Sequence, residues 1–203
     1  SDDEQLVGDI DVGGRQVLFE VEGLVLAVTG LAGLWLLPQS RYRWLFVVVA
    51  TLIMLASFGL ITHRDTFGVT WMLWLVLVVA VTDIAGYFAG RLIGGPKFWP
   101  RVSPKKTWSG TVAGWLGAGI VGWAFMAVTG MGPVLIVISV ALSMASQMGD
   151  IAESAIKRSA GVKDSSALLP GHGGVWDRFD GMLGASLLLL AIESFTGFPS
   201  VTS

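Results

Sequence analysis

The sequence predicts an all-α, polytopic integral membrane protein with about six transmembrane helices and two cytoplasmic functional loops. Of its 203 residues, 53% are hydrophobic and only 14% are charged, whereas about 25% of residues are charged in an average soluble domain. The charges are also unevenly spread, since none falls within residues 23–40, 44–62, 66–82 or 107–149. A bilayer span takes about 20 mostly apolar residues, so these runs indicate membrane helices rather than a soluble enzyme with an apolar core.

The expected spans follow one another closely along the chain. There are six, at about 23–40, 44–62, 66–90, 108–129, 131–149 and 181–199. A cluster of helix breakers at residues 129–133 is placed to turn the chain between the fourth and fifth spans. Ahead of the spans, residues 1–22 carry mostly acidic charge and are expected to form an exposed, non-cytoplasmic segment. Residues 23–203 then form a single transmembrane domain.

The loops between these spans differ in their content of basic residues, which favour the cytoplasmic side of a membrane. If the spans alternate in direction, every Lys and Arg except Arg15 and Arg64 falls on one side. The two long polar loops, 91–107 and 150–180, therefore share the cytoplasmic face. A net charge of −2 argues against nucleic acid as a partner, and the lack of cysteine excludes thiolate metal sites and cysteine nucleophiles.

The loop at 150–180 opens with a stripe of polar residues. Side chains spaced by three and four residues share one face of a helix, and a helix continuing out of the fifth span would align Gln147, Asp150, Glu153, Ser154 and Lys157. The stripe is either a solvated helix end with ion pairs or one wall of a carboxylate-lined site. Asp177 and Asp180 favour the second interpretation, because they directly precede the last span and so lie at the membrane depth of Asp150.

Carboxylates gathered at one depth repel one another unless a cation neutralises them, and hard oxygen ligands select Mg²⁺. Basic side chains stand in the same two loops, namely Lys105, Lys106, Lys157, Arg158, Lys163 and Arg178. Acids that hold a divalent cation beside bases that hold phosphates suit phosphoryl or nucleotidyl transfer. This combination is the main indication of function from the residues alone.

Two short loop segments each leave two interpretations open. Residues 170–174, Pro-Gly-His-Gly-Gly, form either a plain turn or a backbone that approaches a ligand closely, with His172 either structural or catalytic. Residues 103–108 form a basic turn before a helix that Thr107 is placed to cap. This turn serves either as a membrane anchor or as a phosphate clamp for a nucleotide or an anionic lipid head.

Two acidic residues lie inside apolar runs. Asp83 has Tyr87 one turn later and Arg91, within reach of it, two turns later. A carboxylate in such a position is costly and marks a site, an internal ion pair or a water-filled cavity. Glu193 in the last span is less informative, because it is expected near the far interface.

Residues 154–180 read SAIKRSAGVKDSSALLPGHGGVWDRFD, a segment that resembles the signature of phosphatidate cytidylyltransferases, also called CDP-diacylglycerol synthases. Residues 147–154 and 103–108 resemble further motifs of that family, so the likeness covers about 83–181. The chain departs from the pattern at Ser109, where members often have Glu, and in the segment Asp-Ile-Ala-Gly-Tyr at 83–87. Members commonly carry further spans before this region, so we expect the chain to correspond to their C-terminal core.

The resemblance implies that the domain is a catalytic one, a nucleotidyltransferase of phospholipid biosynthesis. Its reaction would transfer a cytidylyl group from CTP to phosphatidate, giving CDP-diacylglycerol and pyrophosphate. The resemblance also implies dependence on Mg²⁺, with K⁺ as a second cation that these residues do not themselves indicate. The enzyme would be integral to the cytoplasmic (inner) membrane, in contact with membrane lipid, with its active site facing the cytoplasm. The oligomeric state stays open, with a homodimer among the choices.

The resemblance further implies roles for individual residues. Asp150 and Asp177 would be the principal metal ligands, with Asp180 and Asp164 in support. Lys157 would join Asp150, Asp177 and Asp180 in the catalytic set. The substrate-binding residues would be Asp83, Ser103, Lys105, Lys106, Thr107, Ser154, Arg158, Lys163, His172, Gly173, Gly174 and Arg178.

Two alternatives stay open. Another CTP-dependent membrane lipid enzyme, such as a lipid-alcohol kinase or a related cytidylyltransferase, would need a similar set of acids and bases. An ion-coupled transporter would use Asp83 as its coupling-ion site. The absence of a visible inverted repeat in the sequence counts against the transporter.

Overall fold

The computed structural model describes Val28 and residues 43–159 and 176–199 of the chain. Its helices are α2 (Arg43–Phe67), α3 (Val69–Leu92), α4 (Trp108–Thr129), α5 (Val134–Ser159) and α6 (Trp176–Thr196). Each of the five is long and apolar enough to cross a membrane, α6 from Phe179 onward. The fold is therefore that of an all-α membrane protein. Five of the six expected spans are confirmed, and the first, at 23–40, lies outside the described residues except for Val28.

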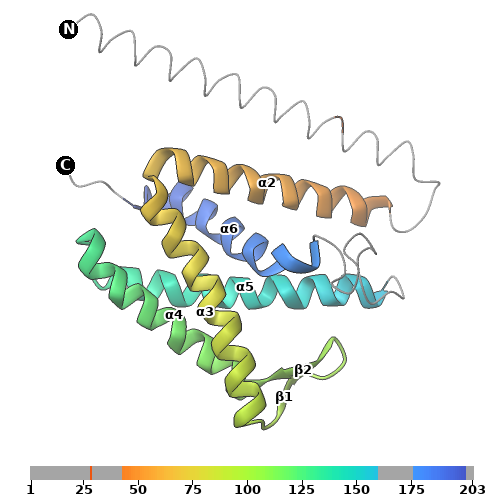
Figure 1. The fold of residues 1–203 in the computed structure, drawn as a ribbon. Helices are drawn as coiled ribbons and strands as arrows, with labels where there is room; N and C mark the ends of the chain where they lie inside the picture. Colours follow the sequence, from red (N-terminus) through yellow and green to blue (C-terminus); the bar gives the residue numbers. More distant parts are fainter. Residues whose placement is uncertain (1–27, 29–42, 160–175, 200–203) are drawn as a thin grey trace, which may run out of the picture. The chain divides into compact units, whose positions relative to one another are not determined.

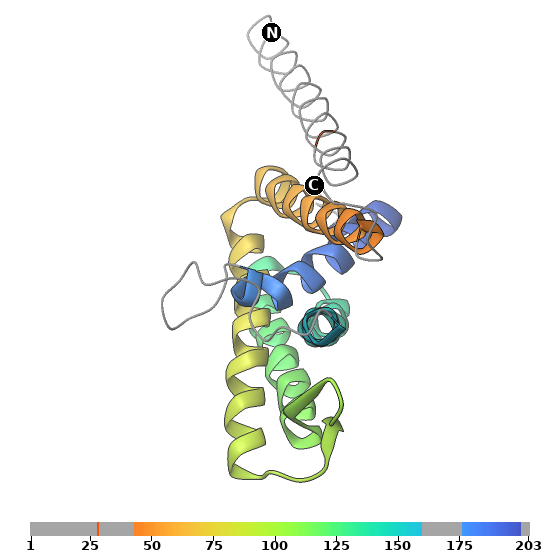
Figure 2. The same ribbon diagram turned by 90° about the vertical axis from the view of Figure 1, so that its right-hand side faces the viewer.

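The chain divides into two compact units, Ser1–Phe58 and Gly59–Ser203. In the first, the described part is Val28 and the beginning of α2. In the second, α3 and α4 lie side by side over most of their length, and α6 packs along α5 (Figure 1). Figure 2, in which α5 is seen nearly end-on, shows that α5 crosses α3 and α4 steeply.

A short β-hairpin joins α3 to α4, which the sequence did not lead us to expect. Strand β1 (Lys97–Trp99) pairs antiparallel with β2 (Ser103–Thr107), with Trp99 opposite Ser103 and Lys97 opposite Thr107. The hairpin lies at the end of the α3–α4 pair (Figure 1). In this hairpin the basic segment 103–107 is an extended strand that leads directly into α4.

The helix ends follow local chemistry that the sequence made visible. Thr107 caps α4, since its Oγ1 accepts a hydrogen bond of 3.2 Å from the backbone N–H of Gly110. At the other end of α4, Gly130 has a φ of 70°, which suits glycine, and its N–H donates to the carbonyl of Met126. The predicted turn at 129–133 is therefore confirmed, and α5 begins directly after Pro133.

The core of the second unit combines apolar packing with hydrogen bonds between helices. Nε1 of Trp74 in α3 donates to Oγ of Ser139 in α5 over 3.0 Å, and Oγ1 of Thr82 donates to Oγ of Ser143 over 2.8 Å. Small polar side chains commonly link membrane helices in this way. These contacts fix α3 against α5 and so place Asp83 and the end of α5 relative to each other. The fully buried apolar residues around them are Trp74, Leu75, Val78, Ala118, Leu135, Leu142 and Ala185.

Two pairs of glycines bring the helix backbones into contact. A Cβ on Gly110 of α4 would lie 2.5 Å from the carbonyl oxygen of Gly86 in α3, which is too close for any side chain. Where α5 meets α6, a Cβ on Gly149 would lie 3.2 Å from the Cα of Gly184. Such close approach is typical of small residues between membrane helices. It also fixes α3 against α4 and α5 against α6 near their polar ends.

Candidate active site

A cavity of about 500 Å³ lies between α3, β2, α4 and α5. Its size is within the roughly 300–1,000 Å³ that small-molecule sites typically have. At Gly86, Gly90 and Gly110 its helical walls consist of backbone alone. The charged and amide side chains that line it are Asp83, Arg91, Lys105, Lys106, Gln147 and Asp150.

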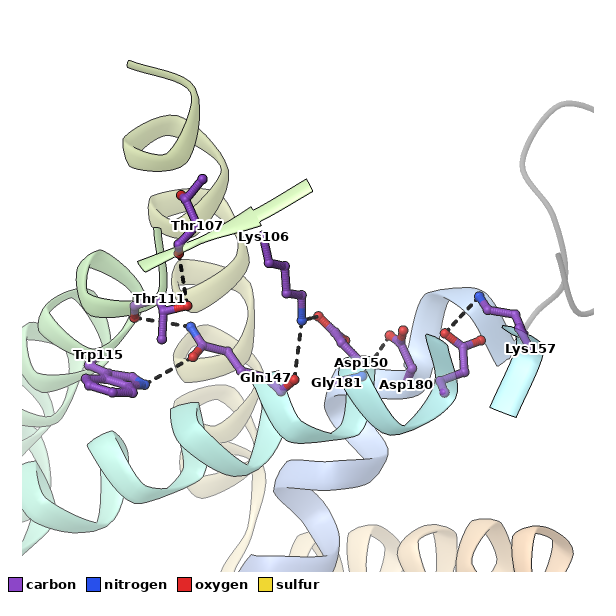
Figure 3. A network of polar contacts seen from close by, with 10 residues as sticks. Lys106, Thr107, Thr111, Trp115, Gln147, Asp150, Lys157, Asp180 and Gly181 are labelled. Atoms are coloured by element: carbon purple, nitrogen blue, oxygen red, sulfur yellow. Dashed lines mark hydrogen bonds and ion pairs between the residues drawn. The ribbon is translucent and has the colours of Figure 1, made fainter. Parts of the chain in front are cut away.

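Lys106 connects β2 to α5 at this cavity. Its Nζ lies 2.7 Å from Oδ2 of Asp150 and donates a second hydrogen bond of 3.3 Å to the carbonyl of Gln147 (Figure 3). The two charged side chains are 27% and 21% exposed, so both are partly shielded from water yet reachable from the cavity. Ion pairs of this kind are electrostatically stronger than fully solvated ones. The ammonium group is therefore held in place before any ligand binds.

Gln147 ties α4 to α5 directly beneath this ion pair. Its Oε1 accepts a hydrogen bond of 3.1 Å from Nε1 of Trp115, and its Nε2 donates over 3.3 Å to the carbonyl of Thr111 (Figure 3). The sequence placed Gln147 in the polar stripe but gave it no role. In the structure its side chain links α5 to α4, and its own backbone carbonyl accepts the second hydrogen bond from Lys106.

Asp180 brings α6 into the same cluster. Its carboxyl interacts with the carboxyls of Asp150 and Glu153, and its Oδ1 accepts a hydrogen bond of 2.8 Å from the N–H of Gly181. Figure 3 shows Asp180 near Asp150, whose carboxylate points to Lys106. Carboxylates this close repel unless a proton or a cation lies among them. The cluster is thus suited to binding positive charge.

Glu153 is a further acidic residue of the cluster, to which the sequence analysis gave no functional role. Its side chain is only 4% exposed, and Oε2 lies 3.0 Å from Nζ of Lys157. Oε1 is buried and, within the described part of the chain, has no hydrogen-bond partner. The signal that could have found it was its position on the polar stripe, between Asp150 and Lys157.

The donor chemistry at this cluster fits a hard cation such as Mg²⁺, for which carboxylate oxygens are the preferred protein ligands. Asp150 and Asp180, on facing helices, would supply two of its ligands. Within residues 43–159 and 179–199, no group of three or more His, Asp and Glu side chains is arranged to hold a metal ion. The side chains of the other two predicted ligands, Asp177 and Asp164, lie outside the described residues.

The structure divides the other predicted site residues into three groups. Asp83, Lys105 and Thr107 line the cavity together with Lys106 and Asp150. Outside it lie Ser103 at the start of β2 and Ser154, Lys157 and Arg158 in the last turns of α5. The third group comprises Arg178, whose side chain is not described although its backbone lies in α6, and Lys163, His172, Gly173 and Gly174, which lie outside the described residues.

Arg91 does not make the contact with Asp83 that the sequence predicted. The sequence put it within reach of Asp83, but its Nη1 donates a hydrogen bond of 2.9 Å to the hydroxyl of Tyr87 instead. Both residues line the cavity, one turn apart on α3. Tyr87 and Arg91 are therefore site residues that the sequence reading named without assigning them.

Comparison with known proteins places the chain in a family. A family model described as the cytidylyltransferase family matches residues 13–195. The chain belongs to the cytidylyltransferase family. Among its relatives, a phosphatidate cytidylyltransferase of Brucella suis is 46% identical over 150 residues, which are 72% of this chain and 55% of the relative. This cytidylyltransferase-family chain therefore spans about half the length of relatives such as the Brucella protein.

Two further cytidylyltransferase relatives come from other bacteria. The phosphatidate cytidylyltransferase of Bacillus subtilis is 40% identical over 127 residues, which are 61% of this chain and 47% of the relative. That of Staphylococcus epidermidis is 31% identical over 179 residues, which are 85% of this chain and 69% of the relative. The family resemblance read from residues 147–180 and 103–108 is confirmed by these matches.

Proposed function

We propose that this chain transfers a cytidylyl group from CTP to phosphatidate, giving CDP-diacylglycerol and pyrophosphate. The observation that carries the proposal is the cavity in which Lys105 and Lys106 meet Asp83 and Asp150 at the ends of apolar helices. A site with basic and acidic side chains at the ends of membrane helices suits a reaction between a water-soluble nucleotide and a lipid phosphate. The relatives, which are named phosphatidate cytidylyltransferases, support the same reaction.

In the proposed reaction, a phosphate oxygen of phosphatidate attacks the α-phosphorus of CTP. A new P–O bond forms, the bond from the α-phosphorus to the bridging oxygen breaks, and pyrophosphate leaves with that electron pair. Lys105 and Lys106 would stabilise the negative charge on the phosphates. Lys106 is suited to this because Asp150 and the carbonyl of Gln147 already orient it, and a preorganised charge costs no reorganisation during the reaction.

Mg²⁺, when bound, would neutralise charge on the nucleotide and on the leaving pyrophosphate. Asp150 and Asp180 would hold it, and Asp177 and Asp164 stay predicted as further ligands. K⁺ as a second cation and a homodimeric assembly also stay predictions.

We further propose that the enzyme lies in the cytoplasmic (inner) membrane with the cavity facing the cytoplasm. The support is the distribution of basic residues, since Arg91 at the end of α3 and Lys97, Arg101, Lys105 and Lys106 in the hairpin segment all belong to the predicted cytoplasmic loop 91–107. Basic loops stay cytoplasmic, and CTP is a cytoplasmic nucleotide. CTP would enter a cavity at that face from the water, and phosphatidate would enter it from the lipid.

The test is a cytidylyltransferase assay on the purified chain in lipid nanodiscs. CTP labelled at the α-phosphate is supplied with phosphatidate or with diacylglycerol, each with and without Mg²⁺. We expect labelled CDP-diacylglycerol, together with unlabelled pyrophosphate, when phosphatidate and Mg²⁺ are both supplied. With diacylglycerol, or without Mg²⁺, we expect neither product. Release of CDP with phosphorylation of diacylglycerol would instead identify a lipid-alcohol kinase and overturn the proposal.

A further inference from the structure

Arg91 and Tyr87 form a polar pair on the α3 wall of the cavity. The guanidinium donates one hydrogen bond of 2.9 Å to the tyrosine hydroxyl, and both side chains are exposed, Tyr87 to 58%. Among the described residues, no Asp or Glu forms an ion pair with Arg91. A cation that lines a cavity and lacks a carboxylate partner is available to an anionic ligand.

The chemistry of the pair fits a phosphate monoester. A guanidinium presents five N–H donors in a planar fork that matches two phosphate oxygens. Since the Tyr87 oxygen accepts from Arg91, its own O–H hydrogen is free to donate in the same direction. The hydrogen bond to Tyr87 also restrains the long arginine side chain, which lowers the entropy lost when a ligand binds.

The position of the pair distinguishes it from the wall of the cavity that carries Lys106 and Asp150. The neighbouring α3 residues Ile84 and Phe88 are apolar and more than half exposed, at 57% and 56%. On a membrane helix, such side chains face lipid acyl chains. The opposite wall carries Lys106, which is bound to Asp150, beside Asp180. That acidic wall suits a triphosphate with its cation, whereas the α3 wall adjoins the hydrocarbon.

We propose that Arg91 and Tyr87 bind the phosphate monoester of the lipid substrate, while Lys106 on the opposite wall serves the nucleotide. The inference rests on the proposed function, because it divides that reaction's two phosphate-bearing substrates between two walls. A lipid phosphate whose acyl chains stay in the bilayer reaches the α3 wall directly. Arg91 and Tyr87 are thus substrate-binding residues for the lipid.

The first test compares kinetic constants of Arg91→Ala, Tyr87→Phe and wild type in nanodiscs. Loss of a charge-assisted hydrogen bond costs about 1.5–3 kcal/mol, so Arg91→Ala should raise the KM for phosphatidate by about tenfold or more. The KM for CTP should change by less than about twofold, and Tyr87→Phe should show a smaller effect of the same kind. Arg101→Ala is the matched control, since Arg101 is also exposed, in the hairpin that follows α3, but does not line the cavity.

A second measurement separates failure of this inference from failure of the proposed function. Native mass spectrometry compares binding of phosphatidate and of diacylglycerol, which lacks the phosphate, to wild type and Arg91→Ala. We expect wild type to prefer phosphatidate and Arg91→Ala to lose that preference, whichever reaction the enzyme carries out. An Arg91→Ala variant that keeps the preference, or that raises the KM for CTP instead, overturns the inference. An equal loss in Arg101→Ala would also overturn it, because the effect would then be one of general loop charge.

Discussion

The ammonium of Lys106 and the carboxylate of Asp150 are 2.7 Å apart, although 43 residues separate them in the sequence and none of those residues is charged. The pair joins the β-hairpin to α5 and closes one wall of the cavity. It also means that neither group acts alone, because removing one leaves the other partly buried without its partner.

Substitution of Lys106 by Met removes the positioned ammonium group. We expect it to lower kcat strongly while the protein still folds. Loss of one positioned donor to a developing charge typically reduces kcat by about 10²–10³, and we expect a reduction of that order. Steady-state kinetics with phosphatidate and CTP measure it, and the chromatographic profile in detergent reports folding. Lys97→Met is the control, because Lys97 lies exposed on β1 of the same hairpin and outside the cavity. A Lys106→Met variant with wild-type kcat and KM would return this segment to a membrane-anchoring role.

Asp180→Asn tests the metal proposal at α6. If Asp180 is a ligand, the variant should need a higher Mg²⁺ concentration for half-maximal activity, by about tenfold or more, since such contacts typically contribute 10–100-fold. Chelation of Mg²⁺ should stop the wild-type reaction, and added Mg²⁺ should restore it. Asp65→Asn, an exposed acidic residue near the end of α2, serves as the control. An unchanged Mg²⁺ requirement in Asp180→Asn would assign this residue a structural role.

The contact between α5 and α6 should tolerate no side chain at Gly184. A Cβ there would overlap the carbonyl oxygen of Ala145 and lie 3.1 Å from the Cα of Gly149. Gly184→Ala should destabilise the protein by about 1–3 kcal/mol, as overpacking commonly does, and lower activity by moving Asp180 away from Asp150. Thermal unfolding in detergent and the activity assay measure the two effects. Gly119→Ala in α4 is the control, because its Cβ would meet its nearest neighbour at an ordinary 3.6 Å, and a comparable loss there would contradict this explanation.

Local patterns in the sequence predicted much of this arrangement. The spacing of Gln147, Asp150, Glu153 and Lys157 suited a helix that continues past the fifth span, and α5 does run to Ser159. Thr107 was identified as a helix cap because its side chain stands at the boundary between a basic turn and an apolar run. Both features depend on residues within a few positions of one another.

Pairings between distant segments could not be predicted in the same way. Nothing near Lys106 in the sequence indicates Asp150 as its partner, because the pairing depends on how β2 meets α5 in space. The hydrogen bond from Arg91 to Tyr87 is different, because these residues are four apart on α3 and helix spacing alone could have indicated it. Strands of three and five residues give too short a pattern to distinguish a hairpin from a loop.

Glu193 is the clearest example of such a pairing, and it supports a last prediction. Its side chain, 11% exposed, forms a hydrogen bond with Nδ1 of His63, which is 1% exposed and packs against Phe67. Breaking a buried pair by removing one partner costs about 3–5 kcal/mol, whereas replacing both by apolar residues is often nearly neutral. His63→Leu and Glu193→Leu should therefore each lower the Tm markedly, and the double variant should recover most of the loss.

The double-mutant cycle separates this pair from simple packing. If the two side chains contributed independently, their losses would add in the double variant, and an additive result would contradict the proposed coupling. Neither residue lines the cavity, so the double variant should keep wild-type KM values for CTP and phosphatidate at temperatures where it is folded. Folding stability would then depend on the His63–Glu193 pair, where α2 meets α6, and catalysis on the separate polar cluster at the cavity.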